Sequence, residues 1–434
     1  MTAAQPLRIG LAGLGTVGGG VLRLLDENEA LVARRAGRSL QVTAVSARDR
    51  SRERGVDLSG LAWEDDATAL ARRNDVDLVV ELIGGADGPA LTLARSTIKA
   101  GRPLVTANKA MLAHHGAELA EMAETAGVPL RFEAAVAGAI PIVKGLSEGA
   151  AANRIARVSG ILNGTCNYIL SAMEREGRDF VEVLGEAQRL GFAEADPGFD
   201  IDGIDAAHKL ALLASLAFGT TPDFASVETG GIRAVRLADI EQARALGFRV
   251  RLVGVAELVS GRMLQQVRPV LVSEGHPLAG VKGALNAIVL EGNHCGRLVF
   301  EGAGAGAGPT ASAVVSDCIA IARGERAPPL AMPLADLEVA ERGNPDERRS
   351  RHYLRLTVAD RPGVLAELAA TLRDCGVSIE SLIQPAATED RPALVAIVTH
   401  NGPEGAVRAA VAAMRALSVV LEPPFMMPIM GDEE

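Results

Sequence analysis

Residues 7–32 read LRIGLAGLGTVGGGVLRLLDENEALV, in which an apolar strand, a glycine turn and an amphipathic helix follow one another. The glycines of the turn have the spacing G-x-G-x-x-G, and the first permits a tight turn. The second lets the backbone approach a pyrophosphate, and the third allows close packing of helix on strand. A plain glycine turn is the alternative, but the flanking strand and helix favour a dinucleotide-binding loop. The residues predicted to bind the cofactor here are Gly13, Gly15, Thr16, Val17 and Gly18.

Alternating strand-like and helical stretches follow this loop. The strand-like stretches are QVTAVSA (41–47), DLVVELI (77–83) and PLVTANK (103–109). Helical patterns over residues 89–101 and 115–127 separate them. This alternation is typical of a parallel sheet with helices on both faces. We therefore expect an α/β chain that begins with a Rossmann-type NAD(P)-binding domain over residues 1–140.

The end of the second strand bears on which nicotinamide cofactor is bound. An Asp or Glu that binds the ribose is expected there, yet the strand ends in Ser46, Ala47 and Arg48, with Asp49 only afterwards. An arginine suits a 2′-phosphate, so the sequence favours NADP, with NAD still possible. The alternative is that Arg48 is an ordinary surface residue.

Three further regions follow residue 140. Residues 141–325 mix longer helical patterns with strands and are expected to form a substrate-binding, catalytic and oligomerisation domain. Residues 326–349 are rich in proline and charge and are predicted to be a linker. Residues 350–430 give the order strand, helix, strand, strand, helix, strand, which predicts a separate, small ferredoxin-like domain.

Composition excludes several classes of function. The chain has 434 residues and a net charge of -10 with no basic stripe, so nucleic acid is not an expected partner. We find neither a signal peptide nor an apolar run of ~18 residues, so we expect a cytoplasmic protein that does not bind membranes. The 4 cysteines lack CxxC spacing, which argues against structural zinc.

The stretch GFAEADPGFDIDGIDAAHK at residues 191–209 gathers carboxylates ahead of one lysine. Such a cluster is kept where it binds a cation, binds a cationic or hydroxyl-bearing ligand, or tunes a proton-transfer group. Residues 204–218 have the pattern of a buried helix, so Asp205 and Lys209, four residues apart, share one face of it. A solvated ion pair is the alternative, but the loop before it and the apolar helix favour a reaction site.

A second group of polar residues ends the strand-like stretch 103–109. Thr106, Asn108 and Lys109 are expected at the carboxyl edge of the sheet, where open α/β sheets bind ligands. Asn108 could instead cap the next helix.

Six motifs follow one another along the chain. They are GLGTVG (13–18), TANK (106–109), FEAAVAGAIPIV (132–143), ILNGTCNYIL (161–170), GFAEADPGFDIDGIDAAHKLALL (191–213) and GAGAGPTASAVVSD (304–317). In this order and spacing, and with the ferredoxin-like tail, they resemble homoserine dehydrogenase with a C-terminal ACT domain. The resemblance covers nearly the whole chain, and the acidic loop is its most specific part.

The resemblance implies reversible reduction of L-aspartate 4-semialdehyde to L-homoserine with NAD(P)H, on the path to threonine and methionine. By similarity, Lys209 would exchange a proton with the substrate oxygen and Asp205 would orient that lysine. Glu194 and Asp200 would bind the amino-acid substrate, and Lys109 would lie between substrate and cofactor. A positioned ammonium also suits the chemistry, because hydride delivery leaves negative charge on the carbonyl oxygen.

The resemblance also implies further ligands. Thr106 and Gly306 would contact the cofactor, and Gly304 or Gly306 would close over the nicotinamide. Threonine is the expected effector of the ACT domain, and a homodimer or homotetramer is expected. A monovalent cation, sodium, would be held by hard oxygen ligands, with a turn that binds no ion as the alternative. Its expected ligands are Glu133, Val136, Gly138 and Ile140.

Two other functions compete with this interpretation. An aldehyde dehydrogenase would trap its substrate on a thiolate, and Cys166, which stands where the family leads us to expect threonine, is the candidate. That function would leave the carboxylates and Lys209 without a role. A non-catalytic sensor would pair a dinucleotide domain with a ligand-binding tail, but the set of acids and lysines argues against it.

Overall fold

The computed structural model describes residues 5–384 and 393–431. Contacts between residues divide the chain into two compact units, each assembled from three segments. Unit 1 comprises Met1–Gly164, Asp205–Val227 and Leu285–Ala340, and unit 2 comprises Thr165–Ile204, Glu228–Ala284 and Glu341–Glu434. This division cuts across the predicted borders at residues 140, 325 and 350, which therefore stay predictions.

Unit 1 contains a six-stranded parallel sheet in the order β3-β2-β1-β4-β5-β6. This is the order of a doubly wound dinucleotide-binding sheet, so the predicted Rossmann-type fold is confirmed. Its central strands are almost wholly buried, as the apolar runs predict. The strands are β1 (Leu7–Ala12), β2 (Leu40–Ser46), β3 (Ala62–Glu64), β4 (Leu78–Glu81), β5 (Leu104–Thr106) and β6 (Leu130–Arg131).

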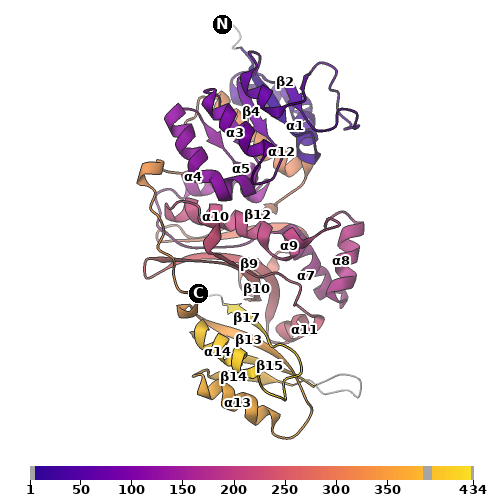
Figure 1. Cartoon of the computed structure of the whole chain (residues 1–434), viewed down its shortest axis with the longest axis vertical. Coiled ribbons are helices and arrows are strands. Elements are labelled where there is room, and N and C mark those ends of the chain that lie inside the picture. The colour runs from indigo at the N-terminus through magenta and orange to yellow at the C-terminus, as the bar shows by residue number, and fades with distance from the viewer. Residues whose placement is uncertain (1–4, 385–392, 432–434) are drawn as a thin grey trace. The chain divides into compact units, whose positions relative to one another are not determined.

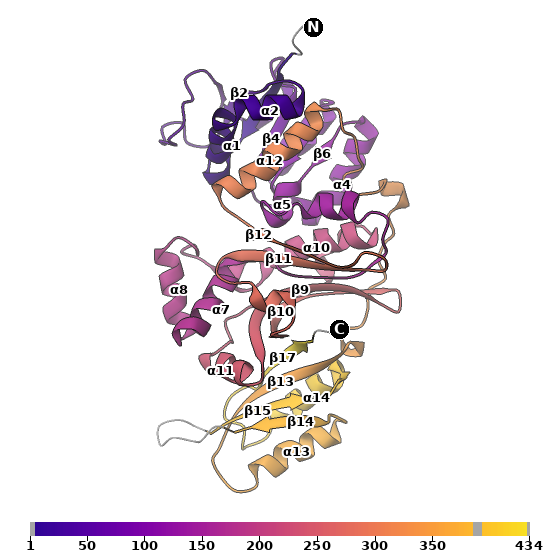
Figure 2. The ribbon, with the colours of Figure 1, turned by 180° about the vertical axis from the view of Figure 1, so that it is seen from behind.

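One helix that covers this sheet comes from far along the chain. α12 (Ala307–Ala322) packs against α1 (Thr16–Glu27), as Figure 2 shows. The contact is close at Gly20, where an added Cβ would lie 2.5 Å from the carbonyl oxygen of Ala307. The buried side chains of α12 join the same core as β1, β2 and α1. The remaining helices of this half of unit 1 are α2 (Glu29–Ala36), α3 (Pro89–Lys99) and α4 (Lys109–Ala126).

The rest of unit 1 includes α10 (Ile204–Phe218), whose bounds match the predicted helix. β11 pairs antiparallel with both β7 and β12. Although α10 and α12 are largely apolar, none of the helices in the described residues is long and apolar enough to span a membrane. The other elements are α5 (Glu133–Ala137), α6 (Ile142–Lys144), β7 (Ile155–Ile161), β11 (Leu285–Gly292) and β12 (Gly296–Ala303).

The main sheet path of unit 2 has the strand order β9-β10-β17-β13-β15-β14, and β16 (Gly402–Pro403) pairs with β13 outside this path. The tail follows the predicted order β13, α13, β14, β15, α14, β17, which confirms the ferredoxin-like domain (Figure 1). The elements of the tail are β13 (Arg349–Val358), α13 (Val364–Asp374), β14 (Ile379–Ile383), β15 (Ala393–Thr399), α14 (Glu404–Met414) and β17 (Phe425–Met430). The earlier elements are α7 (Gly164–Glu176), α8 (Phe180–Arg189), α9 (Gly198–Ile201), α11 (Leu237–Ala245), β9 (Phe248–Val259) and β10 (Arg262–Ser273).

The tail is joined to the rest of unit 2 by backbone pairing and by buried charge. β17 pairs parallel with β10 through Leu271 and Ile429. Arg268 on β10 forms an ion pair of 2.6 Å with the buried Glu404 at the start of α14. The tail therefore shares its sheet with β9 and β10.

Candidate active site

The glycine loop has the geometry that its spacing predicts. Gly13 has a φ of +100°, and an added Cβ would lie 2.5 Å from the carbonyl oxygen of Leu82. A Cβ on Gly18 would overlap the carbonyl oxygen of Gly13, whereas one on Gly15 would meet no atom within 4 Å. Gly15 thus leaves room in front of the first turn of α1, where backbone amides favour an anion.

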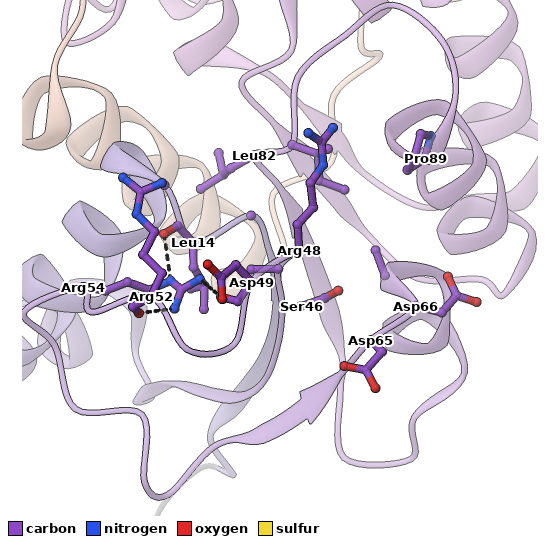
Figure 3. Close-up of a pocket in the computed structure, with 15 residues that line it drawn as sticks. Leu14, Ser46, Arg48, Asp49, Arg52, Arg54, Asp65, Asp66, Leu82 and Pro89 are labelled. Atoms are coloured by element: carbon purple, nitrogen blue, oxygen red, sulfur yellow. Dashed lines mark hydrogen bonds between the residues drawn. The ribbon is translucent and has the colours of Figure 1, made fainter.

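A cavity of about 620 Å³ lies beside this loop and is drawn in Figure 3. It is lined by the glycine loop, the residues after β2 and the loop after β4. Arg48 lines it and extends away from Asp49. The carboxylate of Asp49 accepts hydrogen bonds from the hydroxyl and amide of Ser51, which lower the pKa of Asp49. The acidic residue after β2 is thus already engaged, while Arg48 faces the cavity.

Two more arginines at this cavity were missed from the sequence. Arg54 donates to the carbonyl oxygens of Leu14 and Asp49, and its guanidinium lies 5.6 Å from the centre of the Trp63 ring. These contacts tie the loop after β2 to the glycine loop. Arg52 lines the same cavity. The alternation of arginines from residue 48 to residue 54 was the available signal.

A second cavity, of about 270 Å³, contains the two lysines that the sequence singled out. Lys109 at the start of α4 and Lys209 in α10 both line it. Val17 and Gly306 line it too, so the glycine loop and the N-terminus of α12 meet the lysines at one place. A nicotinamide cofactor therefore fits a site formed by the glycine loop, the loop after β4 and these two lysines.

Asp205 links the two lysines. Its Oδ1 lies 2.6 Å from Nζ of Lys109, and its Oδ2 lies 2.8 Å from Nζ of Lys209. Asn163, two residues after the end of β7, donates to Oδ2 at 2.9 Å, and Lys209 also donates to the carbonyl oxygen of Leu162 at 2.8 Å. Asp205 is thus held by three side-chain donors in the first turn of α10.

The charge of this carboxylate is maintained by its partners. Burial alone would raise the pKa of Asp205, but the ammonium groups of Lys209 and Lys109 hold it well below its ordinary value of 3.8. The N-terminus of α10 also favours an anion. Because Asp205 stays ionised at neutral pH, it can fix both ammonium groups and cannot itself serve as the proton donor there.

The predicted cation loop is formed by α5 and the turn after it. The carboxylate of the buried Glu133 accepts hydrogen bonds from the amides of Val143 and Lys144. Burial raises the pKa of Glu133 to about 7. Gly138 has a φ of +56°, so the chain turns sharply beside Glu133. A buried carboxylate that keeps lone pairs beside a turn of backbone carbonyls fits a hard monovalent cation.

Comparisons with known proteins decide the family. The chain matches the family model of the homoserine dehydrogenase NAD-binding domain over residues 13–133 and that of homoserine dehydrogenase over residues 141–319. Residues 352–418 match the ACT domain. A homoserine dehydrogenase from Neisseria gonorrhoeae is 43% identical over 425 residues, which are 96% of this chain and 97% of that protein. The chain belongs to the homoserine dehydrogenase family.

Solved homoserine dehydrogenases have the same fold. The structure from Thiobacillus denitrificans is 40% identical with a TM-score of 0.93 and covers 99% of this chain and 100% of its own. A hyperthermophilic archaeal homoserine dehydrogenase in complex with NADPH is 27% identical with a TM-score of 0.62, and the match covers 73% of this chain and 97% of that one. The chain is therefore a nicotinamide-dependent oxidoreductase that acts on a CH–OH group and interconverts aspartate semialdehyde and homoserine.

Three other residues predicted for the site, Glu194, Asp200 and Thr106, are not among the residues that line the cavity with the two lysines. Glu194 is exposed and Asp200 is half-buried, and both belong to unit 2, so their contact with substrate stays a prediction. Thr106 is fully buried and donates its hydroxyl to Glu81, which gives it a supporting contact that the sequence did not indicate.

The two competing functions, a thiolate-dependent aldehyde dehydrogenase and a non-catalytic sensor, are not supported. Cys166 is 0% exposed and its thiol donates to the carbonyl oxygen of Asp200. A thiol in that position lacks the exposed, electropositive surroundings of a reactive cysteine. A non-catalytic sensor is excluded because the chain belongs to an enzyme family. Among the described residues, no group of three or more His, Cys, Asp or Glu side chains could hold a metal ion.

Proposed function

We propose that Lys209 exchanges the proton of the substrate hydroxyl and that Asp205 holds it in position. The observation that supports this most directly is the ion pair of Asp205 with Lys109 and Lys209 beside the cavity that both lysines line. A structural ion pair would not need two lysines that face the same cavity.

The chemistry follows from the charges. Reduced nicotinamide, when bound, supplies a hydride to the aldehyde carbon. The carbonyl oxygen gains negative charge in that step, and Lys209 donates a proton to it, so the C=O bond becomes a C–OH group. Lys109 adds a second positive charge at the same cavity. In the reverse direction, Lys209 in its neutral form accepts the hydroxyl proton.

The substrate is an amino acid, and its α-ammonium needs an anion. We assign this contact to Glu194, in the loop after α8, and to Asp200, in α9. We assign a sodium ion to the turn formed by Glu133, Val136, Gly138 and Ile140, where it would offset the buried charge of Glu133 and fix the turn that ends α5.

We infer that NADP is the preferred cofactor. Arg48 faces the cavity next to the glycine loop, whereas Asp49 is engaged by Ser51. The archaeal relative is described in complex with NADPH, which agrees with this assignment. Thr16, Gly306 and the glycines of the loop would contact the rest of the cofactor.

We further propose that the ACT domain binds threonine. A cavity of about 550 Å³ surrounds the loop Asp360–Gly363, which ends at the N-terminus of α13. Backbone amides at a helix N-terminus suit the carboxylate of an amino acid. A homodimer or homotetramer and a location in the cytoplasm complete the proposal.

The reaction can be tested by mixing the purified full-length enzyme with NADPH and aspartate semialdehyde in the absence of phosphate. Consumption of NADPH and equimolar formation of homoserine support the proposal. NADPH that is not consumed, together with phosphate-dependent reduction of NADP⁺ that oxidises the aldehyde to an acyl phosphate, would contradict it.

The effector site can be tested with a substitution that keeps the helix. Leu365 is 40% exposed in the first turn of α13 and lines the cavity. Leu365→Asp suits the helix dipole but repels a carboxylate, so threonine should inhibit this variant at least tenfold less strongly. Leu421→Asp, at a leucine that is 54% exposed, is the control and should keep wild-type inhibition. A wild-type enzyme that ignores millimolar threonine would refute the assignment.

A further inference from the structure

A buried glutamate that the sequence analysis passed over lies at the carboxyl end of β4. Glu81 is 0% exposed, and it pairs in register with Ala12 of β1 on one side and Thr106 of β5 on the other. It therefore lies at the same sheet edge as the glycine loop and the start of α4. A buried carboxylate is costly unless hydrogen bonds compensate it, so its contacts need an explanation.

One oxygen of Glu81 holds the loop after β4. Oε1 accepts hydrogen bonds from the amides of Ile83 at 2.6 Å and Gly84 at 3.2 Å. Both residues line the cavity that contains the two lysines, and Ile83 also lines the larger cavity beside the glycine loop. This arm of Glu81 therefore sets the position of a wall of the cofactor site.

The other oxygen leads to the start of α4. Oε2 accepts from the hydroxyl of Thr106 at 2.5 Å, and the same hydroxyl oxygen accepts from the amide of Asn108 at 3.0 Å. The side-chain oxygen of Asn108 accepts from the amide of Met111 at 3.1 Å, and its amide group donates to Gly85 at 2.8 Å. Asn108 thus caps α4, which was the alternative role predicted for it. Through Thr106 it also belongs to the hydrogen-bond network of Glu81.

The network continues into the reaction site. Lys109, the first residue of α4, contacts Oδ1 of Asp205, and Asp205 contacts Lys209. We propose that Glu81 is a positioning residue. It fixes Lys109, and through Asp205 also Lys209, in a set position relative to the loop after β4. Burial raises the pKa of Glu81, and the hydrogen bonds from Thr106 and the two backbone amides favour its ionised form.

Substitutions can separate the two arms of Glu81, which are the hydrogen bonds of Oε1 to the loop after β4 and the hydrogen bond of Oε2 to Thr106. In Glu81→Gln the amide oxygen can still accept from Ile83 and Gly84, but the amide nitrogen cannot accept from Thr106. We expect kcat to fall about fivefold to tenfold, the worth of one lost hydrogen bond, while the Kd of NADPH measured by fluorescence stays within twofold. Thr106→Val breaks the same arm and should reproduce this result. Glu81→Ala breaks both arms and should also weaken NADPH at least fivefold.

Thr97→Val is the matched control. Thr97 is buried in α3 of the same unit, and its hydroxyl has no hydrogen-bond partner among the described residues. The same chemical change there should alter neither kcat nor the Kd of NADPH by more than twofold. A loss of activity in Thr97→Val equal to that in Thr106→Val would show that any buried Thr→Val change perturbs the unit, and the proposal would fail.

The inference rests on the proposed role of Lys109, so the closing experiment repeats Thr106→Val in a Lys109→Met background. If Glu81 and Thr106 act through Lys109, the second change should lower kcat less than twofold there. An equal loss in both backgrounds overturns the inference but leaves the role of Lys109 intact. If Lys109→Met alone keeps wild-type kcat, the role of Lys109 fails, and the inference fails with it.

Discussion

Two buried carboxylates in this protein each hold a pair of basic side chains, and the pairs differ in kind. In unit 1, Asp205 contacts Lys109 and Lys209. In unit 2, Glu404 contacts two arginines. Each carboxylate lies in the first turn of its helix and has one of its partners four residues later on that helix. In both cases basic side chains hold the pKa of the carboxyl group below its ordinary value against the effect of burial, and at Glu404 the imidazole of His352 contributes to this together with the arginines.

The difference lies in what the basic partners can do. A lysine can give up its proton near neutral pH when its surroundings permit, whereas an arginine keeps its charge. The lysines face a cavity. The arginines join the tail to the rest of unit 2, because Arg268 of β10 contacts Glu404 of α14, and Arg408 of α14 also contacts Glu228, which lies ahead of β9. The same local geometry therefore supports chemistry in one unit and attachment in the other.

The largest expected effect comes from removing the lysine of unit 1. Lys209→Met should lower kcat by about 10²-fold or more, because proton transfer typically contributes ~10² to 10⁴, and NADPH should bind nearly as in the wild type. Asp205→Asn should also be slow, since it loses the charge that holds the lysine. Steady-state kinetics with a fluorescence titration of NADPH test this. A Lys209→Met enzyme with more than half of wild-type turnover would make Lys209 a structural residue.

Breaking the corresponding cluster in unit 2 should affect stability and not turnover. Glu404→Gln leaves Arg268, which is only 12% exposed, beside an uncharged partner. Removing one partner of a buried ion pair costs about 3–5 kcal/mol, so urea unfolding should show a loss of that order with kcat within twofold of wild type. Glu367→Gln, in the exposed pair with Arg361, is the control and should cost less than about 1 kcal/mol. Equal losses in both variants would contradict the distinction.

The pH dependence of stability tests the charge of the carboxylate in unit 1. The pKa of Asp205 is lowered in the folded state, so its contribution to stability is fully present above its ordinary value of 3.8 and is lost as the pH falls below it. The difference in Tm between wild type and Asp205→Asn should therefore be constant from pH 7 to about pH 5 and should shrink below about pH 4. Asp26→Asn, at an exposed position of α1, should show no such trend. A difference that grows on acidification would reverse the sign of the argument.

The smallest expected effect concerns Arg48, a basic residue that we expect to bind a phosphate without transferring a proton. Arg48→Ala should weaken NADPH more than NADH, because a charge-assisted contact to phosphate contributes roughly 1.5–3 kcal/mol. The ratio of the two dissociation constants should change by about tenfold or more, with kcat at saturating cofactor near wild type. Equal weakening of both cofactors would remove Arg48 from the phosphate site.

Local patterns in the sequence predicted local structure well. α10 has the predicted bounds because its sequence keeps the apolar pattern of a buried helix from residue 204 to residue 218. The glycine loop, Lys109 and Asp205 with Lys209 were identified because their spacing carries the signal. Each of these predictions depends on neighbours within a few residues.

Contacts between segments far apart in the chain could not be predicted from such local patterns. The packing of α12 on α1 and the pairing of β17 with β10 join residues far apart in the chain. Glu81 and Asn163 acquire roles only through partners that the fold brings to them, Thr106 and Asp205. Glu81 ends a buried strand and Asn163 lies two residues beyond one. A polar residue at or just after the end of a buried strand is therefore a signal in the sequence, but it does not identify the partners of that residue.

The central claim is that the cluster around Asp205 needs a lysine that can transfer a proton, whereas the cluster around Glu404 needs only positive charge. Two substitutions that conserve charge test this claim most directly. Lys209→Arg keeps a positive charge beside Asp205, and Arg408→Lys keeps one beside Glu404. The single measurement is kcat at saturating substrate and cofactor. We predict that Lys209→Arg loses about 10²-fold or more, while Arg408→Lys stays within twofold of wild type. A Lys209→Arg enzyme with more than half of wild-type kcat would contradict the account, because a permanent charge would then suffice where we require a proton.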